Sequence, residues 1–305
     1  MTTDADTRQS TPVASGSDRG RTGSGSTLRA RRRRRPVVTN VLAVLFCAVW
    51  VFPIYWMVNT AFKPAGETTS LTPSWLPLNP TLDNFRQALD SSNLLRYFAN
   101  SAIVVLGAVA VSIALGFLAC AALTRFRFVG RRQIFVAILF VQMIPSGALL
   151  IPLFLSFQSL GLLNNYIGLI LAYVATVLPF TIWTLRGFFI GIPVELEEAA
   201  RIDGATDFQV LRKVLLPLVM PGLISTSVFA FITAWNDYII AYVMLKDQDN
   251  YTLPVWLASF STATQGTDYG ALMAASVLFS VPVIIFFLVV QRGLVAGMTA
   301  GAVKG

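Results

Sequence analysis

The sequence predicts an all-α polytopic membrane protein with six transmembrane helices. Three observations support this fold class: the mean hydropathy is +0.67, charged residues make up only 12% of the chain, and six apolar stretches are long enough to cross a bilayer. Soluble domains carry about 25% charged residues, so this chain has too few to cover a water-exposed surface. Helices are expected because an apolar helix of about 20 residues satisfies its backbone hydrogen bonds within the bilayer.

Residues 1–36 are predicted to form a disordered, basic tail. Residues 1–28 are rich in Ser, Thr, Gly and Asp and hold almost no large apolar groups, which is typical of disorder. Arg29 and the run Arg31–Arg35 then directly precede an apolar stretch. A basic cluster at this place indicates membrane topology and contact with anionic lipid headgroups, and not nucleic-acid binding. The apolar stretch is too long for a cleaved signal peptide.

The six spans are expected at residues 37–59, 101–123, 134–157, 167–189, 218–245 and 271–290. They make up a transmembrane domain of residues 37–291, and residues 292–305 form a C-terminal tail. Prolines lie within the spans at positions 53, 145, 152, 179, 221 and 282. Proline would break a helix in water, but neighbouring helices in a bundle can satisfy the freed carbonyls, so kinked spans are expected.

The placement of lysine and arginine predicts the orientation. With the N-terminus in the cytoplasm, 19 of the 23 basic residues fall on the cytoplasmic side. Both termini are then cytoplasmic, and residues 63–97 form an external segment with a short amphipathic helix near residues 82–89. Residues 191–217 form a cytoplasmic loop.

This loop is the most polar segment in the apolar part of the chain, with eight charged residues within Glu195–Lys213. Three glutamates in its first turn complement the positive end of a helix, and Gly204 suits the left-handed residue that ends one. Thr206 and Gln209 have the spacing of a capping box, which predicts a second helix from about residue 207. The result is a helix–glycine–helix knob. It either binds a groove on a partner protein or is an ordinary exposed loop.

The same residues resemble the EAA loop of permease subunits of ABC importers. That pattern is EAA, three residues, Gly, nine residues, an apolar residue, one more residue and Leu-Pro, and every interval is present. The resemblance implies that the loop docks into a cleft of a cytoplasmic ATPase subunit and transmits its movements. It assigns this coupling to Glu198, Ala199, Ala200, Asp203, Gly204, Phe208, Leu216 and Pro217.

Further stretches resemble the carbohydrate-uptake branch of these permeases, and most of all its maltose-type second subunit. They are TLDNF (81–85), NSAIV (101–105), LGLLNNYIGLIL (160–171), FITAWNDY (231–238) and RGLVAGMTAGAVKG (292–305). The resemblance covers the chain from residue 37 onward and implies the six-helix type I permease fold. Two departures, at Asn165 and at Asp237-Tyr238, where Thr and Glu-Phe are usual, bear on substrate contacts.

Polar residues within the spans are the candidates for a translocation path. Trp235, Asn236 and Asp237 lie towards the outer end of the fifth span, where an aromatic ring, an amide and a carboxylate suit a hydroxyl-rich sugar. Asp237 can equally be a hydrated interfacial group or bond a neighbouring helix. Gln142 in the third span is a further candidate, and an interhelical hydrogen bond is its alternative role.

The chain itself is expected to bind no cofactor and no metal. It has no histidine and no GxxxxGK[ST] phosphate loop, and its two cysteines, Cys47 and Cys120, lie in apolar runs and are expected to be buried. The resemblance implies that ATP and Mg are bound by a partner ATPase. It further implies a second permease subunit, two copies of a cytoplasmic ABC ATPase and an extracytoplasmic sugar-binding protein, assembled in the cell membrane with its lipid.

Other classes of protein remain as alternatives. Six spans with an intramembrane acid are compatible with a stand-alone ion-coupled secondary transporter that acts as a dimer. An intramembrane enzyme is disfavoured because no nucleophile–base arrangement stands out, and a membrane scaffold is a further alternative. The identity of the sugar does not follow from this sequence, since the external binding protein usually selects it.

Overall fold

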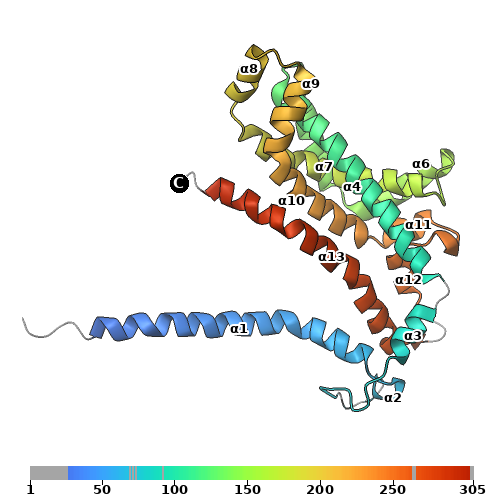
Figure 1. The fold of residues 1–305 in the computed structure, drawn as a ribbon. Helices are drawn as coiled ribbons and strands as arrows, with labels where there is room; N and C mark the ends of the chain where they lie inside the picture. The colour runs from blue at the N-terminus through green and yellow to red at the C-terminus, as the bar shows by residue number, and fades with distance from the viewer. Residues whose placement is uncertain are drawn as a thin grey trace, which may run out of the picture. The chain divides into compact units, whose positions relative to one another are not determined.

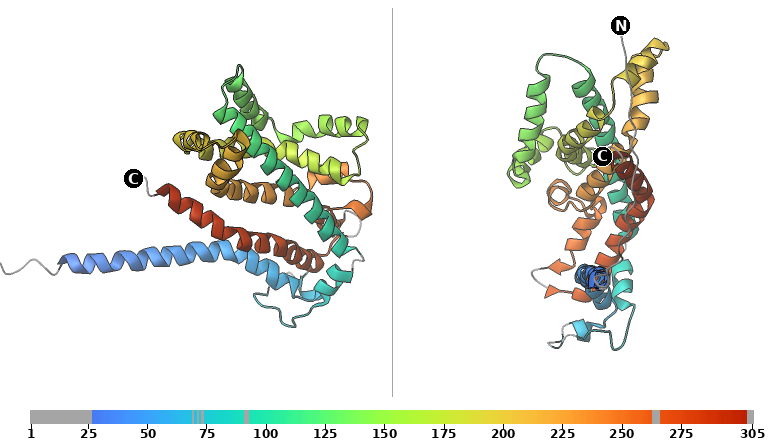
Figure 2. Two further views of the ribbon diagram at one scale, coloured as in Figure 1. Left: turned by 45° about the horizontal axis from the view of Figure 1, so that its top comes forward. Right: turned by 90° about the vertical axis from the view of Figure 1, so that its left-hand side faces the viewer.

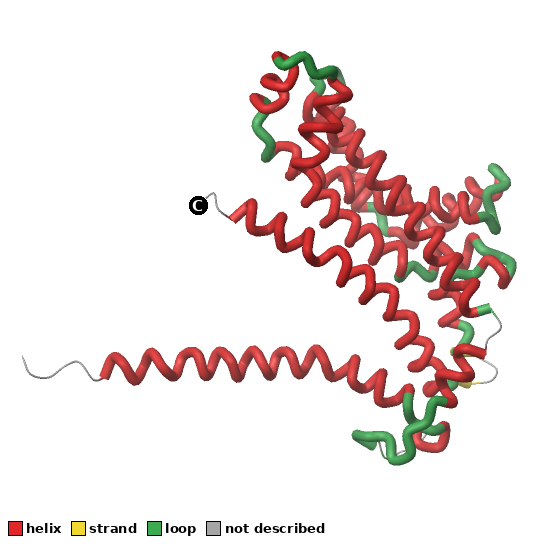
Figure 3. Tube along the Cα trace, viewed as in Figure 1, coloured by secondary structure: helices red, strands yellow, loops and turns green. Residues whose placement is uncertain are grey.

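The computed structural model describes residues 27–68, 70, 72, 74–90, 93–262 and 266–302. These residues are helical almost throughout (Figures 1 and 3). The chain divides into two compact units, residues 1–54 and 55–305, which are described separately.

The first unit contains most of helix α1 (Thr27–Ala61). Its apolar side chains are exposed, for example Val49 at 70% and Trp50 at 67%, as expected of a helix that faces lipid. Residues 1–26 of the predicted tail lie outside the described residues. Residues 27–36 are helical where the sequence predicts a disordered tail, because arginine is a good helix former and a helix extends readily once begun. Cys47, predicted to be buried, is exposed on this helix.

The second unit contains the remaining elements. They are α2 (Ala65–Thr68), α3 (Asp83–Asp90), α4 (Leu94–Arg125), α5 (Arg131–Met143), α6 (Ser146–Ser159), α7 (Tyr166–Ile190), α8 (Glu195–Ile202), α9 (Asp207–Gln209), the π-helix η1 (Val210–Leu215), α10 (Leu216–Trp235), α11 (Ile239–Met244), the 3₁₀-helix η2 (Gln248–Asn250), α12 (Leu253–Ala258) and α13 (Tyr269–Ala302). Two short antiparallel strands, β1 (Ser261–Thr262) and β2 (Gly266–Thr267), pair before α13. Helix α3 is the amphipathic helix that the sequence predicts near residues 82–89.

Among the described residues, five helical segments are long and apolar enough to cross a membrane. They are Val37–Ala61, Leu94–Arg125, Tyr166–Ile190, Asp207–Trp235 and Tyr269–Gln291. A sixth span exists only if α5 and α6 are counted together, and these two helices are bent by 103°. The multi-pass helical architecture is therefore confirmed, and the span expected at residues 134–157 consists of two helices with a bend much sharper than a proline kink within one helix.

The break in the third span lies at Pro145. Proline lacks a backbone N–H and pushes the residue before it into an extended conformation, and Ile144 has φ −74° and ψ 125°. The fifth span also differs from the prediction of residues 218–245. It begins earlier, at Asp207 through η1, and α10 ends at Trp235, so that α11 is a separate short helix.

Helices α4, α7 and α10 lie side by side and form the centre of the second unit (Figures 1 and 2). Small residues allow the close approach of α4 and α7. A Cβ atom on Gly116 of α4 would lie 2.5 Å from Cγ2 of Thr181 on α7. Such contacts favour association of transmembrane helices, for which burial from water supplies no driving force.

Two clusters of buried side chains follow each other along α4 and α7. One joins the first half of each helix to the end of α10 and to α11, α12 and α13, and includes Leu169, Tyr173, Phe231, Trp235 and Met244. The other joins the second half of α4 and of α7 to η1 and the start of α10, and includes Phe117, Cys120, Leu185, Phe189 and Leu215. We call them the distal cluster and the knob-side cluster.

Candidate functional site: a helical knob anchored on two spans

Residues 191–217, called the knob below, fold as the sequence predicts into two helices around a glycine. Helix α8 ends at Ile202, and Gly204 has φ +84°, a left-handed conformation that costs glycine little. The N–H of Ala205 then donates to the carbonyl of Ala200 at 3.0 Å, which closes the end of the helix. The turn reverses the chain at one end of the second unit, where α8 and α9 are labelled in Figure 1.

The second helix of the knob begins with the predicted capping box. The Thr206 hydroxyl accepts a hydrogen bond from the Gln209 N–H at 3.3 Å, and the Gln209 side chain accepts one from the Thr206 N–H at 2.9 Å. Two N–H groups that a helix start leaves unpaired are thereby satisfied. Helix α9 continues without interruption through the π-helix η1 into α10. The knob is thus joined rigidly to a membrane-spanning helix.

A buried ion pair holds the base of the knob. Glu197 of α8 is only 2% exposed, and its carboxylate contacts the guanidinium of Arg125, the last residue of α4, at 2.5 Å. The same guanidinium donates to the carbonyls of Phe189 at 3.0 Å and Ile192 at 3.2 Å. One side chain therefore ties the knob to the ends of both α4 and α7.

No pattern in the sequence singles out this pair. Glu197 stands beside Glu195 and Glu198, which are both exposed, and Arg125 is one of four arginines between residues 125 and 132. Spacing along the chain gives no signal that one glutamate and one arginine meet across two helices. Breaking such a pair is costly because the remaining charge is buried alone.

A second, weaker bridge spans the two helices of the knob. Arg201 on α8 contacts Asp207 on α9 at 3.1 Å and lies 4.0 Å from Glu197. Because Arg201 is 44% exposed and Asp207 73% exposed, water screens this pair and it adds little stability.

The tip of the knob exposes large apolar side chains. Ile202 is 86% exposed and Phe208 is 69% exposed. Among the residues that the sequence assigns to coupling, Glu198, Ala199, Asp203, Gly204, Phe208 and Pro217 are exposed, and Ala200 and Leu216 are half-buried. Of the predicted apolar side of the second helix, Leu215 is buried and Leu211 is half-buried, whereas most of the Phe208 side chain is exposed. An exposed aromatic on a short helix is what a docking surface presents.

The candidates for a translocation path are spread over separate places. Trp235 is 2% exposed and lies in the distal cluster, stacked on Phe231 at 5.4 Å between ring centroids and tilted against Phe279 at 5.9 Å. Asn236 is exposed, and its side chain donates to the carbonyl of Ile232. Trp235 is therefore part of the packing between α10 and α13.

Asp237 is half-buried in the turn between α10 and α11. Its carboxylate accepts a hydrogen bond from the Tyr173 hydroxyl on α7 and one from the Ala241 N–H at the start of α11, both at 3.2 Å. The bond to Tyr173 joins Asp237 to a neighbouring helix, which is one of the alternatives that the sequence left open.

Gln142 lies elsewhere, near the end of α5. It lines a cavity of about 210 Å³ together with Thr176 and Pro179 of α7 and Ile240 of α11. Ile240 lies three residues after Asp237, and Thr176 lies three residues after Tyr173. The cavity therefore neighbours the Asp237–Tyr173 hydrogen bond, although neither of these two residues lines it. Sequence reasoning missed Tyr173 and Thr176, because one hydroxyl in an apolar helix carries no pattern.

Several apolar spans joined to an exposed helical knob fit a membrane permease of the transporter class. Residues 112–300 match the family described as binding-protein-dependent transport system inner membrane component. The chain belongs to this family, which makes it a transport subunit of an ABC importer rather than an enzyme.

Two curated relatives match most of the chain. The diacetylchitobiose uptake system permease protein DasC of Streptomyces coelicolor is 45% identical over 266 residues, which cover 87% of this chain and 96% of that protein. The trehalose transport system permease protein SugB of Mycobacterium tuberculosis is 36% identical over 273 residues, which cover 89% and 99%. Both are named as permeases of sugar transport systems.

A solved structure shares the fold. One chain of a bacterial ABC transporter involved in the import of the acidic polysaccharide alginate matches with a TM-score of 0.76 at 27% identity, over 89% of this chain and 99% of that chain. The fold class predicted from the sequence, a type I ABC importer permease, is confirmed by this match and by the family.

Proposed function

We propose that this chain forms half of the translocation pathway of an ATP-driven importer for a sugar or oligosaccharide. The knob is its contact with a cytoplasmic ATPase. The observation that carries the proposal is the knob itself, whose base is fixed by the buried Arg125–Glu197 pair while its tip exposes Ile202 and Phe208. A rigid base and an apolar tip suit an element that receives a force and passes it on.

The mechanism follows from these attachments. Closure of the ATPase pair moves the knob, and Arg125 passes the movement to the ends of α4 and α7, while η1 passes it to α10. Because these three helices lie side by side, they shift together and change access from one side of the membrane to the other. Such a switch needs ligands that bind the two states with different affinity, which ATP and the loaded binding protein supply.

The family and the relatives support the rest of the proposed assembly. We place ATP and Mg on two copies of a separate ABC ATPase, the second half of the pathway on a second permease subunit, and sugar capture on an extracytoplasmic binding protein. The relatives named for diacetylchitobiose and trehalose support a di- or oligosaccharide. The distribution of basic residues along the sequence, with 19 of the 23 assigned to one side of the membrane, supports cytoplasmic termini.

The proposed path for the sugar runs past the polar groups between α7 and the α10–α11 turn. Asp237 and Tyr173 present a carboxylate and a hydroxyl there, and Gln142 and Thr176 line the neighbouring cavity. Groups of this kind exchange hydrogen bonds with sugar hydroxyls at little net cost. Trp235 and Asn236 support the turn.

Site-specific crosslinking tests the docking. Ile202→Cys in the assembled importer is expected to crosslink to the ATPase subunit, and Val129→Cys, fully exposed in the loop between α4 and α5, serves as the control. Recovery of no ATPase from Ile202→Cys would overturn the proposed contact.

A reconstitution separates this function from that of a stand-alone ion-coupled dimer. Liposomes that contain the chain alone are expected to take up no sugar under a proton or sodium gradient. Uptake should require the ATPase, the second permease subunit, the binding protein and ATP. Gradient-driven uptake by the chain alone would favour the secondary transporter.

A further inference from the structure

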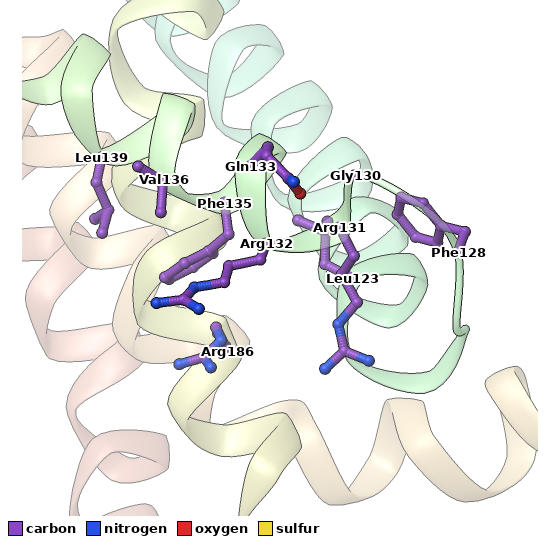
Figure 4. Close-up of a pocket in the computed structure, with 10 residues that line it drawn as sticks. All are labelled: Leu123, Phe128, Gly130, Arg131, Arg132, Gln133, Phe135, Val136, Leu139 and Arg186. Carbon is purple, nitrogen blue, oxygen red and sulfur yellow. The ribbon is translucent and has the colours of Figure 1, made fainter.

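A second feature of the knob side is an open pocket of about 590 Å³ beside α5. It lies between the end of α4, the turn at residues 126–130, the start of α5 and the end of α7. Three arginines line it, Arg131 and Arg132 at the start of α5 and Arg186 near the end of α7. Figure 4 shows the Arg132 and Arg186 side chains close to the Phe135 ring, with Arg131 on the other side of the same space.

The charge of this pocket is not balanced. Among the described residues, Arg131, Arg132 and Arg186 form no ion pair, and no Asp or Glu lines the pocket. Arg186 lies over the Phe135 ring at 4.5 Å. By contrast, the nearby Arg125 and Arg201 both have carboxylate partners. Three guanidinium groups around one space attract an anion, and arginine binds phosphate oxygens in pairs.

The remaining lining of the pocket is apolar. Phe128, Phe135, Val136 and Leu139 form one side of it, and α5 carries this apolar surface on into the predicted third span. A free phosphate ion makes no favourable contact with an apolar surface of this kind. A phospholipid has both parts, since its phosphate matches the arginines and its acyl chains match the apolar side.

We propose that this pocket binds the headgroup phosphate of an anionic phospholipid from the leaflet on the knob side. The proposal rests on the orientation given under the proposed function, because the cytoplasmic leaflet is the one rich in anionic lipid. Arg186 precedes α8 by nine residues, so the lipid lies at the same end of the spans as the knob. Bound there, it joins the start of α5 to the end of α7.

Lipid retention by the full-length chain tests the proposal without any transport measurement. The purified chain in mixed micelles is given phosphatidylglycerol, phosphatidylcholine or inorganic phosphate, and bound molecules are counted by native mass spectrometry. Wild type is expected to retain phosphatidylglycerol in preference to phosphatidylcholine. The double variant Arg132→Gln/Arg186→Gln should retain it on the order of tenfold less, since each basic residue near an anionic surface contributes several-fold.

Two matched variants keep the test specific. Arg127→Gln/Arg212→Gln removes the same charge from exposed positions outside the pocket and should retain the lipid as wild type does. Arg132→Lys/Arg186→Lys keeps the charge and should retain most of it, which shows that a folded pocket with altered side chains still binds.

Three results would each overturn the proposal. Equal loss in the pocket variant and in the exposed-site variant would indicate general charge attraction. Displacement of phosphatidylglycerol by millimolar inorganic phosphate would identify a free anion as the occupant. Unchanged lipid retention in the glutamine pocket variant, together with weaker binding of the ATPase subunit, would identify a protein surface. Because retention is measured on the chain itself, failure of sugar uptake would leave this test unaffected.

Discussion

The knob and the turn between α10 and α11 both interrupt helical structure, but for different reasons. In the knob, the turn lies at residues whose local chemistry favours it: Gly204 with φ +84°, and the capping box of Thr206 and Gln209. Residues 236–238, between Trp235 and Ile239, contain neither glycine nor proline. There the carboxylate of Asp237 accepts the Ala241 N–H and the hydroxyl of Tyr173 on another helix.

This difference shows that short-range chemistry alone shapes the knob, whereas the turn combines a short-range bond from the Ala241 N–H with a contact between helices. The knob uses tertiary contact for its attachment, through Arg125 and Glu197. Substitutions in the knob should therefore fall into three kinds. Some break its attachment to α4 and α7, some remove an exposed apolar side chain from its tip, and some strain its turn. Changes at the turn should act on the path between helices.

Replacement of Glu197 by alanine is expected to have the largest effect, because it detaches the knob. Arg125 would stay buried without its carboxylate, and removal of one partner from a buried ion pair costs about 3–5 kcal/mol. Thermal unfolding of the purified importer measures the loss, and uptake should disappear with it. Glu195→Ala, an exposed position on the same helix, is the control and should change stability by less than about 0.5 kcal/mol. Equal melting of both variants would contradict the role of the pair.

Replacement of Asp237 by leucine is expected to abolish sugar uptake while the subunits still assemble. Leucine leaves the Tyr173 hydroxyl and the Ala241 N–H without their acceptor, and each such group costs about 1–3 kcal/mol if it stays buried. Asp237→Asn keeps an acceptor oxygen and should retain part of the uptake. ATP-dependent uptake of labelled sugar into liposomes is the measurement. Wild-type rates in the leucine variant would remove Asp237 from the path.

Replacement of Phe208 by alanine is expected to lower uptake roughly tenfold without changing the melting temperature. The side chain is 69% exposed, so its loss leaves the fold intact, whereas a central aromatic of an interface contributes about 2 kcal/mol. Co-purification of the ATPase with the chain reports the docking directly. Val129→Ala trims an apolar residue that is fully exposed and should change neither quantity. A lower melting temperature for Phe208→Ala would assign the ring to the fold instead.

Replacement of Gly204 by alanine should have the smallest effect, about 1 kcal/mol of lost stability. Its φ of +84° is unfavourable for a residue with a Cβ atom, although the space around it is open. Gly187→Ala is the matched control, because this helical glycine also has open space but no positive φ, and alanine favours helix. If both variants melt alike, the left-handed turn does not constrain the knob.

Local signals predicted several elements closely. Residues 82–89 were expected to be an amphipathic helix, and α3 covers Asp83–Asp90. The capping box and the left-handed glycine of the knob both lie where their spacing places them. Each of these depends on atoms only a few residues apart, so the chain carries the whole interaction in one short stretch.

The prolines within the spans have different effects on the helices. Pro152, Pro179, Pro221 and Pro282 all lie inside helices, whereas Pro145 separates α5 from α6 with a bend of 103°. Pro145 is followed by Ser146 and Gly147, and a Ser-Gly pair is typical of turns, which is a local signal that distinguishes it from the other four. Some of these prolines are tolerated within a helix and one is not, because neighbouring helices can satisfy the carbonyl groups that proline leaves without a partner at some positions only.

The sequence by itself determined that the chain is a helical membrane protein with a polar knob, because hydropathy, charge placement and motif spacing act over short distances. The tertiary structure alone decided that Glu197 is the buried glutamate, that Arg125 holds it, and that Tyr173 reaches Asp237. These pairs are separated by 64 or more residues in the chain, and only the packing of α4, α7 and α10 brings their charges and hydroxyls within bonding distance.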